Sequence, residues 1–199
     1  MFLKTKYLFL TAALAIFLLF FYKSKDDNSN TQIGGSYELT NHLGQKITNK
    51  SFNGYFRLVF FGFTNCPDFC PNTLNDIGLI VDKIDKKDRL VPIFITVDPE
   101  RDTVKKLEKY VKNFHPKIIA LTGSSDEIKN VKKTFKIFSK KIIPAENNHK
   151  DHHHKHSHGD YAVDHTTIIY LMDKKGKYLT HFSPDTNNDK IIKKINKFL

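Results

Sequence analysis

The chain contains 199 residues, of which 40% are hydrophobic and 27% are charged. This length fits one domain of roughly 150 residues with extensions and excludes two ordinary domains. The formal net charge is +11, yet only three of the 32 basic residues are arginine, and the lysines are spread along the chain. Because arginine usually makes the bidentate contacts to bases and phosphates, we predict that no nucleic acid binds. Two cysteines are too few for a disulfide framework.

An apolar run occupies residues 7–22, after an N-terminal flank at 1–6. As a helix it would extend about 24 Å, which is short for a hydrocarbon core of about 30 Å. Lys6 and Lys23 can extend to the interfaces from either end. A cleaved signal peptide is the alternative, but no small residues mark a cleavage site. We therefore predict an uncleaved transmembrane anchor.

Residues 23–35 are polar, show no apolar periodicity and form a predicted linker to a folded domain at 36–199. Apolar patterns in that domain predict alternating strands and helices. Strands are expected at 37–40, 45–48, 57–63, 90–97, 118–121, 166–172 and 177–182, and helices at 71–86, 103–114, 125–138 and 188–199. This order predicts an α/β fold of the thioredoxin-like kind, a central mixed sheet flanked by helices, with the N-terminal transmembrane helix in addition.

The strongest local feature is the cysteine pair, Cys66 and Cys70, between a continuously apolar strand and a helix predicted to begin at Pro71. A helix N-terminus stabilises negative charge, so we expect a lowered thiolate pKa, and thiolate is both nucleophile and metal ligand. The spacing is one residue longer than the C-x-x-C of thioredoxins. It allows both sulfurs to converge on a metal as easily as on each other. The alternative is a pair of cysteines that only pack in the core.

Two thiolates are too few for a closed zinc site, whereas soft sulfur ligands favour Cu(I). The candidate for a third ligand is His165, immediately before a predicted strand. A redox thioredoxin normally has a proline at this position, and this chain has none between Pro144 and Pro184. The pattern therefore favours metal binding over disulfide exchange, although a lone histidine is often structural.

Three acidic residues near the predicted site have a structural or a functional interpretation. The run from Asp98 to Thr103 joins a strand to a helix, where Asp102 is the expected N-cap. The functional alternative is that Asp98, at the carboxyl end of its strand, lines the rim of the metal site. Asp164 is a candidate acceptor for an imidazole N–H, which would orient the ligand ring.

A histidine-rich insertion occupies residues 147–159 and contains six histidines: His149, His152, His153, His154, His156 and His158. Neutral imidazole suits Cu(II), Zn(II) and Ni(II), so these residues form a candidate auxiliary metal site. The alternative is a solvated insertion without a function. The insertion has no apolar residue to bury, so we expect it to be exposed and poorly ordered without metal.

Three runs of the sequence, at residues 60–71, 97–103 and 164–165, resemble the SCO/SenC family in order and spacing. The resemblance covers about residues 36–199. It implies a thioredoxin-like fold, a membrane anchor and a copper site in which Cys66, Cys70 and His165 are the ligands. It also implies a role in assembling the binuclear copper centre of cytochrome c oxidase subunit II. The histidine-rich insertion is the clear departure from the family.

The sequence thus predicts a copper chaperone, single-pass in a bacterial inner membrane, with its globular domain in the periplasm. Its expected partners are cytochrome c oxidase subunit II and a thiol reductant or copper donor. We predict no enzymatic activity, and the open alternative is a thiol–disulfide reductase acting on the oxidase copper-site cysteines, or a thiol peroxidase. A third hypothesis is a metal buffer built around the histidine-rich insertion.

Overall fold

The computed structural model describes residue 17 and residues 32–143 and 161–199. The chain divides into two compact units, Met1–Gln32 and Ile33–Leu199. Among the described residues, no helix combines the length and apolarity needed to cross a bilayer. The predicted anchor, apart from Phe17, and the whole histidine-rich insertion lie outside the described residues.

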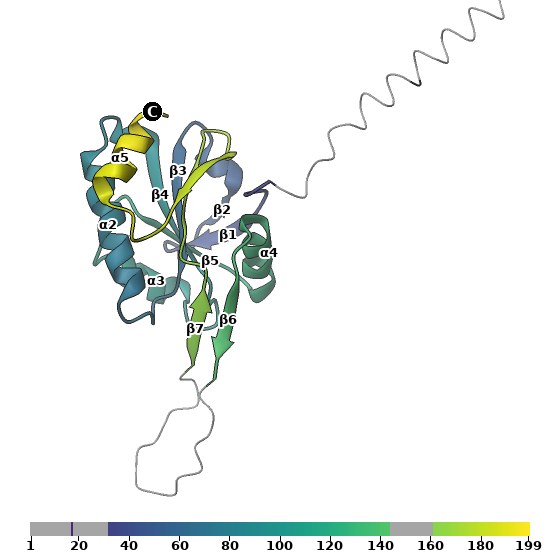
Figure 1. Ribbon diagram of the computed structural model, residues 1–199. Coiled ribbons are helices and arrows are strands. Elements are labelled where there is room, and N and C mark those ends of the chain that lie inside the picture. The colour runs from purple at the N-terminus through teal and green to yellow at the C-terminus, as the bar shows by residue number, and fades with distance from the viewer. Residues whose placement is uncertain (1–16, 18–31, 144–160) are drawn as a thin grey trace, which may run out of the picture. The chain divides into compact units, whose positions relative to one another are not determined.

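A seven-stranded mixed sheet forms the centre of the second unit, in the order β2-β1-β5-β4-β3-β8-β9 (Figure 1). The strands are β1 (Glu38–Asn41), β2 (Lys46–Thr48), β3 (Phe56–Gly62), β4 (Leu90–Thr96), β5 (Ile119–Thr122), β8 (Ile169–Met172) and β9 (Tyr178–Phe182). β3, β4 and β5 are parallel, and the remaining pairings are antiparallel. The predicted α/β fold with a central mixed sheet is confirmed.

Helices cover both faces of this sheet. They are α2 (Phe69–Lys83), α3 (Val104–Val111), α4 (Ser125–Phe135) and α5 (Asn188–Asn196), with short 3-10 helices η2 (Asn49–Phe52) and η3 (Lys87–Arg89). Successive residues of a strand point to opposite faces. Phe60 of β3 accordingly contacts Phe69 of α2, whereas Phe61 contacts Phe135 of α4. Burial on both faces explains why β3 is apolar throughout.

The first turn of α2 begins earlier than the sequence predicts. The helix starts at Phe69, so Cys70 lies in its first turn and not in the preceding loop. The Asp68 side chain makes no capping hydrogen bond. The sulfur of Cys66 instead accepts the backbone N–H of Cys70, one of the donors that the first turn of a helix leaves unpaired.

The predicted N-cap of α3 is wrong. The cap is Thr103, whose side chain accepts the backbone N–H of Lys106 at 3.3 Å. Asp102 is turned away from the helix terminus, because its carboxylate is buried in hydrogen bonds with two threonines. The predicted helix at 125–138 also ends early, at Phe135, because Lys136 adopts the left-handed conformation typical of a helix end.

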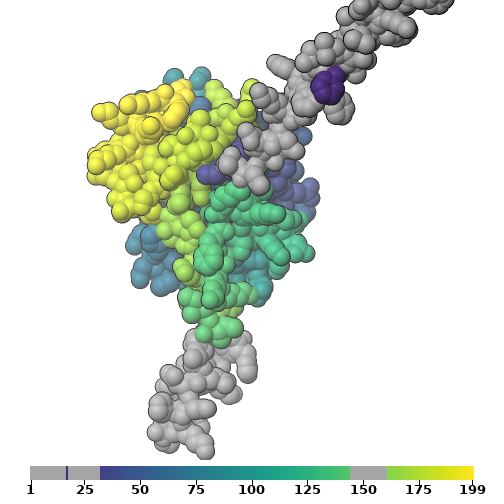
Figure 2. Space-filling model, turned by 45° about the vertical axis from the view of Figure 1, so that its right-hand side comes forward, coloured from purple at the N-terminus to yellow at the C-terminus, as the bar shows by residue number. Residues whose placement is uncertain are grey.

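A separate two-stranded ribbon, β6 (Ser139–Ile142) and β7 (Ala162–His165), projects from the domain (Figures 1 and 2). The sequence does not predict it, because three of the four β6 residues are exposed and show no apolar alternation. His165 is the last residue of β7 and pairs with Ser139. The expectation that His165 directly precedes a strand at 166–172 is wrong, since β8 begins only at Ile169.

Candidate metal centre

The three predicted ligands come from three different elements. Cys66 lies in the loop after β3, Cys70 in the first turn of α2, and His165 at the end of β7. The Sγ atom of Cys70 is 3.8 Å from Nε2 of His165, although the two residues are 95 positions apart. The backbone N–H of Cys70 also contacts Cys66 Sγ at 3.3 Å. The fold therefore brings the cysteine pair and the distal histidine to one place.

The separation of Cys70 and His165 suits a shared metal ion. Thiolate and imidazole bonds to zinc are about 2.3 and 2.0 Å long, so a similar metal with a trigonal angle between them would hold sulfur and nitrogen about 3.7 Å apart. The observed 3.8 Å is close to that value. Within the described residues, no three His, Cys, Asp or Glu side chains yet form a group that could hold a metal together. Binding of one ion by all three side chains would therefore require them to come closer together.

Contacts around the imidazole orient His165 towards the sulfur. Nδ1 lies 2.9 Å from the backbone carbonyl oxygen of Thr166, a contact that assigns the proton to Nδ1 and leaves Nε2 to face Cys70. Phe63 packs edge-on against the ring, with centroids 5.7 Å apart. Burial lowers the pKa of His165, which favours the neutral form that binds metals. Asp164 is exposed, and the acceptor for the ring is the Thr166 carbonyl.

The pKa of the Cys70 thiol is shifted in the direction opposite to the one predicted. Its side chain is fully buried, and this burial raises the pKa of the Cys70 thiol. A backbone hydrogen bond involving Phe63 acts in the opposite direction but is outweighed. The expected lowering by the helix N-terminus is therefore wrong for Cys70. A metal would have to displace its proton on binding. Cys66, in contrast, is partly exposed.

Gly62 is a feature of the site that our reading of the sequence missed. A Cβ atom at this position would lie 2.8 Å from Cys70 Sγ, so only glycine leaves room for the sulfur. The available signal was a glycine that interrupts an otherwise bulky, buried strand just before the cysteines.

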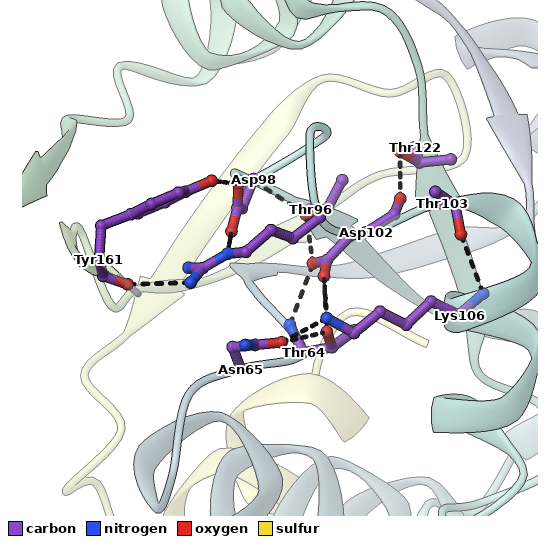
Figure 3. Close-up of polar contacts among 10 residues, drawn as sticks. Thr64, Asn65, Thr96, Asp98, Asp102, Thr103, Lys106, Thr122 and Tyr161 are labelled. Carbon is purple, nitrogen blue, oxygen red and sulfur yellow. Dashed lines mark hydrogen bonds and ion pairs between the residues drawn. The ribbon is translucent and has the colours of Figure 1, made fainter. Parts of the chain in front are cut away.

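Polar contacts beside the site connect Asp98 and Asp102 to Thr64, Arg101 and Tyr161, three residues to which the sequence had suggested no role (Figure 3). Asp98 is buried and accepts hydrogen bonds from Tyr161 Oη and Arg101 Nε, each at 2.5 Å. Asp102 is also buried and binds Thr64. The sequence signal was the run 97–103, in which we had interpreted Asp102 as an N-cap and Asp98 as a residue at the rim of the site.

The SCO1/SenC family model matches residues 25–199. The chain belongs to the SCO1/SenC family. A SCO2-like protein of Rickettsia prowazekii is 41% identical over 162 residues, which cover 81% of this chain and 74% of that protein. The family resemblance predicted from three short motifs is thus confirmed.

Solved structures of SCO1/SenC relatives share the fold. ScoI of Arabidopsis thaliana with copper bound has a TM-score of 0.72 and 36% identity, over 83% of this chain and 96% of that chain. BsSco, a member of the Sco family of cytochrome c oxidase assembly proteins, has a TM-score of 0.61 and 24% identity, over 84% of this chain and 94% of that chain. In this SCO1/SenC chain, β3 and β4 are parallel, so the motifs that follow them lie at the same edge of the sheet.

Proposed function

We propose that this protein is a copper chaperone that binds one Cu(I) through Cys66, Cys70 and His165 and assists assembly of cytochrome c oxidase. Membership of the SCO1/SenC family supports the role in oxidase assembly. The copper-bound ScoI relative supports the choice of metal. The observation that carries the ligand assignment is the 3.8 Å contact between Cys70 Sγ and His165 Nε2.

The chemistry of the three side chains suits delivery of Cu(I). Soft thiolates select Cu(I), and a three-ligand site leaves room for an incoming thiolate from the recipient. The proposed recipient is the binuclear copper centre of subunit II, reached by exchange of one ligand at a time. Cys66 carries the partly exposed thiolate, so it is the first sulfur to be exchanged, while buried Cys70 and half-buried His165 retain the metal.

The proposed domain organisation keeps this site near the membrane. We assign residues 7–22 to an anchor, 23–35 to a linker and 36–199 to a periplasmic domain of a bacterial inner-membrane protein. Fractionation tests the anchor, because the full chain should sediment with membranes and remain there in high salt. A chain that lacks residues 1–22 should be released.

Replacement of His165 tests the metal site and separates it from the alternative function. In His165→Ala with both cysteines present, copper affinity and oxidase assembly should both fall, because one of three ligands is lost. The matched control is His181→Ala on β9, which should keep both at the wild-type level. Affinity is measured by competition with a chromophoric Cu(I) chelator, and assembly by oxidase activity when copper is limiting.

The alternative is a thiol–disulfide reductase, which the free cysteine pair and its contact favour. Such an exchanger needs the thiolates and access to its partner but no imidazole, so His165→Ala would keep most of its activity. Because an imidazolium can itself lower a thiolate pKa, thiol titration is repeated in this variant. Native-level oxidase assembly by His165→Ala would favour the reductase and exclude the copper-chaperone mechanism.

The histidine-rich insertion is proposed as an auxiliary site for Cu(II), Zn(II) or Ni(II). Deletion of residues 150–158 should reduce the number of weakly bound Cu(II) or Zn(II) ions and leave one tight Cu(I) per chain. Equilibrium dialysis with metal analysis measures both. Loss of the tight Cu(I) would instead make the insertion the main site, as in the metal-buffer hypothesis.

A further inference from the structure

The loop between β4 and α3, residues 98–102, holds the start of the cysteine segment (Figure 3). The carboxylate of Asp102 has no exposed surface and accepts the backbone N–H of Thr64 at 3.0 Å and the Thr64 hydroxyl at 2.6 Å. Thr96 at the end of β4 donates to the same carboxylate at 2.7 Å. Thr64 lies two residues before Cys66, so a buried, fully engaged carboxylate fixes where the cysteine segment leaves β3.

A second set of contacts with the cysteine segment comes from Lys106 of α3. Lys106 Nζ lies 3.8 Å from the Asp102 carboxylate and donates a hydrogen bond to Asn65 Oδ1. Thr122 of β5 donates to the backbone carbonyl of Asp102 at 2.9 Å, which fixes the loop itself against the sheet. The cysteine segment is therefore held by a loop that is in turn anchored on two central strands.

The same loop holds the start of the histidine strand. Tyr161 directly precedes β7, four residues before His165, and its hydroxyl donates to Asp98 at 2.5 Å. Arg101 donates from Nη1 to the backbone carbonyl of Tyr161 at 2.9 Å, and its guanidinium lies 3.7 Å above the Tyr161 ring. Arg101 Nε also binds Asp98. Two buried or half-buried charged groups thus bind both the backbone and the side chain of Tyr161.

Arg101 also lies near Phe63, the residue that packs against the imidazole of His165. Its guanidinium lies 5.9 Å from the centre of the Phe63 ring, and Phe63 is the aromatic residue that packs edge-on against His165. Within the part of the chain that the structure describes, β7 pairs only with β6 and is not hydrogen-bonded into the seven-stranded sheet. The register of the main sheet therefore does not set the distance from His165 to the cysteines. Contacts with the loop 98–102 can set that distance instead.

We propose that the loop 98–102 sets the separation between the cysteine pair and His165. Asp102 is the positioning residue on the cysteine side, and Asp98 with Arg101 are the positioning residues on the histidine side. The inference rests on the proposed copper function, because that separation matters most when one ion must bind all three ligands.

The histidine side is tested with Tyr161→Phe, which removes the hydrogen bond to Asp98 and keeps the ring under Arg101. We expect the Cu(I) affinity of the full chain to fall about tenfold, the lower end of what the loss of an orienting partner costs a metal site. In the His165→Ala background the same substitution should change affinity no further, because it acts through His165. The matched control is Tyr178→Phe on β9, whose hydroxyl binds His181; it should leave affinity unchanged.

The cysteine side is tested with Thr64→Val, which removes one hydrogen bond to Asp102 and keeps the side-chain shape. Affinity should fall in both the wild-type and the His165→Ala backgrounds, since this substitution acts through the cysteines. Thr134→Val in α4, which removes a hydroxyl bonded to the backbone of Val131, is the control. Equal effects of Thr64→Val and Thr134→Val would overturn the role of Asp102.

A metal-free measurement separates this inference from the copper function. Long-range ¹H–¹⁵N spectra report the imidazole nitrogens of His165, assigned by their loss in His165→Ala. Tyr161→Phe should shift or broaden these signals at an unchanged unfolding midpoint, whereas Tyr178→Phe should not. Unchanged His165 signals in Tyr161→Phe overturn the inference. If the signals move but His165→Ala binds Cu(I) as tightly as the wild type, the ligand assignment fails and the positioning role stands.

Discussion

The sulfur of Cys70 occupies space that exists only because residue 62 has no side chain. A Cβ atom on Gly62 would lie 2.8 Å from both Cys70 Sγ and a ring carbon of Phe94. Both neighbours are fully buried, so neither can move freely. The position of one proposed ligand thus depends on a residue that makes no polar contact with it.

We predict that Gly62→Ala weakens both the fold and the site. Overpacking of this kind costs about 1–3 kcal/mol of unfolding free energy, and displacement of Cys70 should lower Cu(I) affinity in the protein that remains folded. Guanidinium unfolding followed by circular dichroism and chelator competition measure the two effects. The control is Gly35→Ala, whose added methyl would lie 3.3 Å from the Thr134 side chain and contact no other described residue. Wild-type affinity in folded Gly62→Ala would contradict the prediction.

Among the elements, α4 has the best-defined start. Ser124 accepts the backbone N–H of Glu127 at 3.2 Å, and the Glu127 carboxylate accepts the backbone N–H of Ser124 at 2.7 Å. This reciprocal pair satisfies two backbone donors at the helix start. Glu127 also binds Lys46 of β2 at 3.1 Å, so the same carboxylate connects the helix to the edge of the sheet.

Removing the cap should therefore destabilise the protein measurably. We expect Ser124→Ala to lower the free energy of unfolding by about 1 kcal/mol, the usual cost of losing a serine cap. Ser125→Ala, at the exposed neighbouring position, should change it by less than about 0.5 kcal/mol. Equal midpoints for the two variants in urea unfolding would show that the cap contributes nothing.

The two elements on either side of Cys66 and the ribbon show where the prediction of elements succeeded and where it failed. β3 and α2 were predicted because long apolar runs and helical periodicity are local properties. β6 and β7 were not predicted, because short exposed strands have no apolar pattern and form only by pairing with each other. His165 was therefore identified as a ligand candidate but assigned to the wrong kind of local structure.

For the molecule as a whole, a buried arginine joins the start of the central strand to a distant turn. Arg57 of β3 is buried, and its Nη2 donates to Asn53 Oδ1 at 3.1 Å. Its guanidinium also lies against Gly176 in the β8–β9 turn, where φ is +81° and a Cβ would collide with Nη1. Arg57 lies near the opposite end of β3 from the cysteine segment, so this contact serves folding and not the site.

Gly44 and Gly176 have almost the same φ, so replacing each with alanine distinguishes the steric cost of an added methyl from the cost of the left-handed conformation. Gly44 has a φ of +82°, and no atom of the described residues would lie within 4 Å of a Cβ there, so Gly44→Ala should cost only the left-handed conformation, about 1–2 kcal/mol. Gly176→Ala should cost about 1–3 kcal/mol more, because the methyl also displaces Arg57. Denaturant unfolding measures both, and Cu(I) affinity per folded chain should stay at the wild-type level. Equal losses of stability in Gly44→Ala and Gly176→Ala would show that the contact between Arg57 and Gly176 contributes nothing to the cost.

The sequence by itself determined the order of the main strands and helices, the family and the cysteine pair. These features follow from local apolar patterns and short motifs, which can be recognised without knowledge of the fold. Only the tertiary structure decided that Asp102 faces Thr64 and not the helix it was expected to cap. It also decided that Cys70 has a raised pKa and that Arg101 holds the start of the histidine strand. Each of these depends on which distant residues exclude water from a polar group, and no local pattern contains that information.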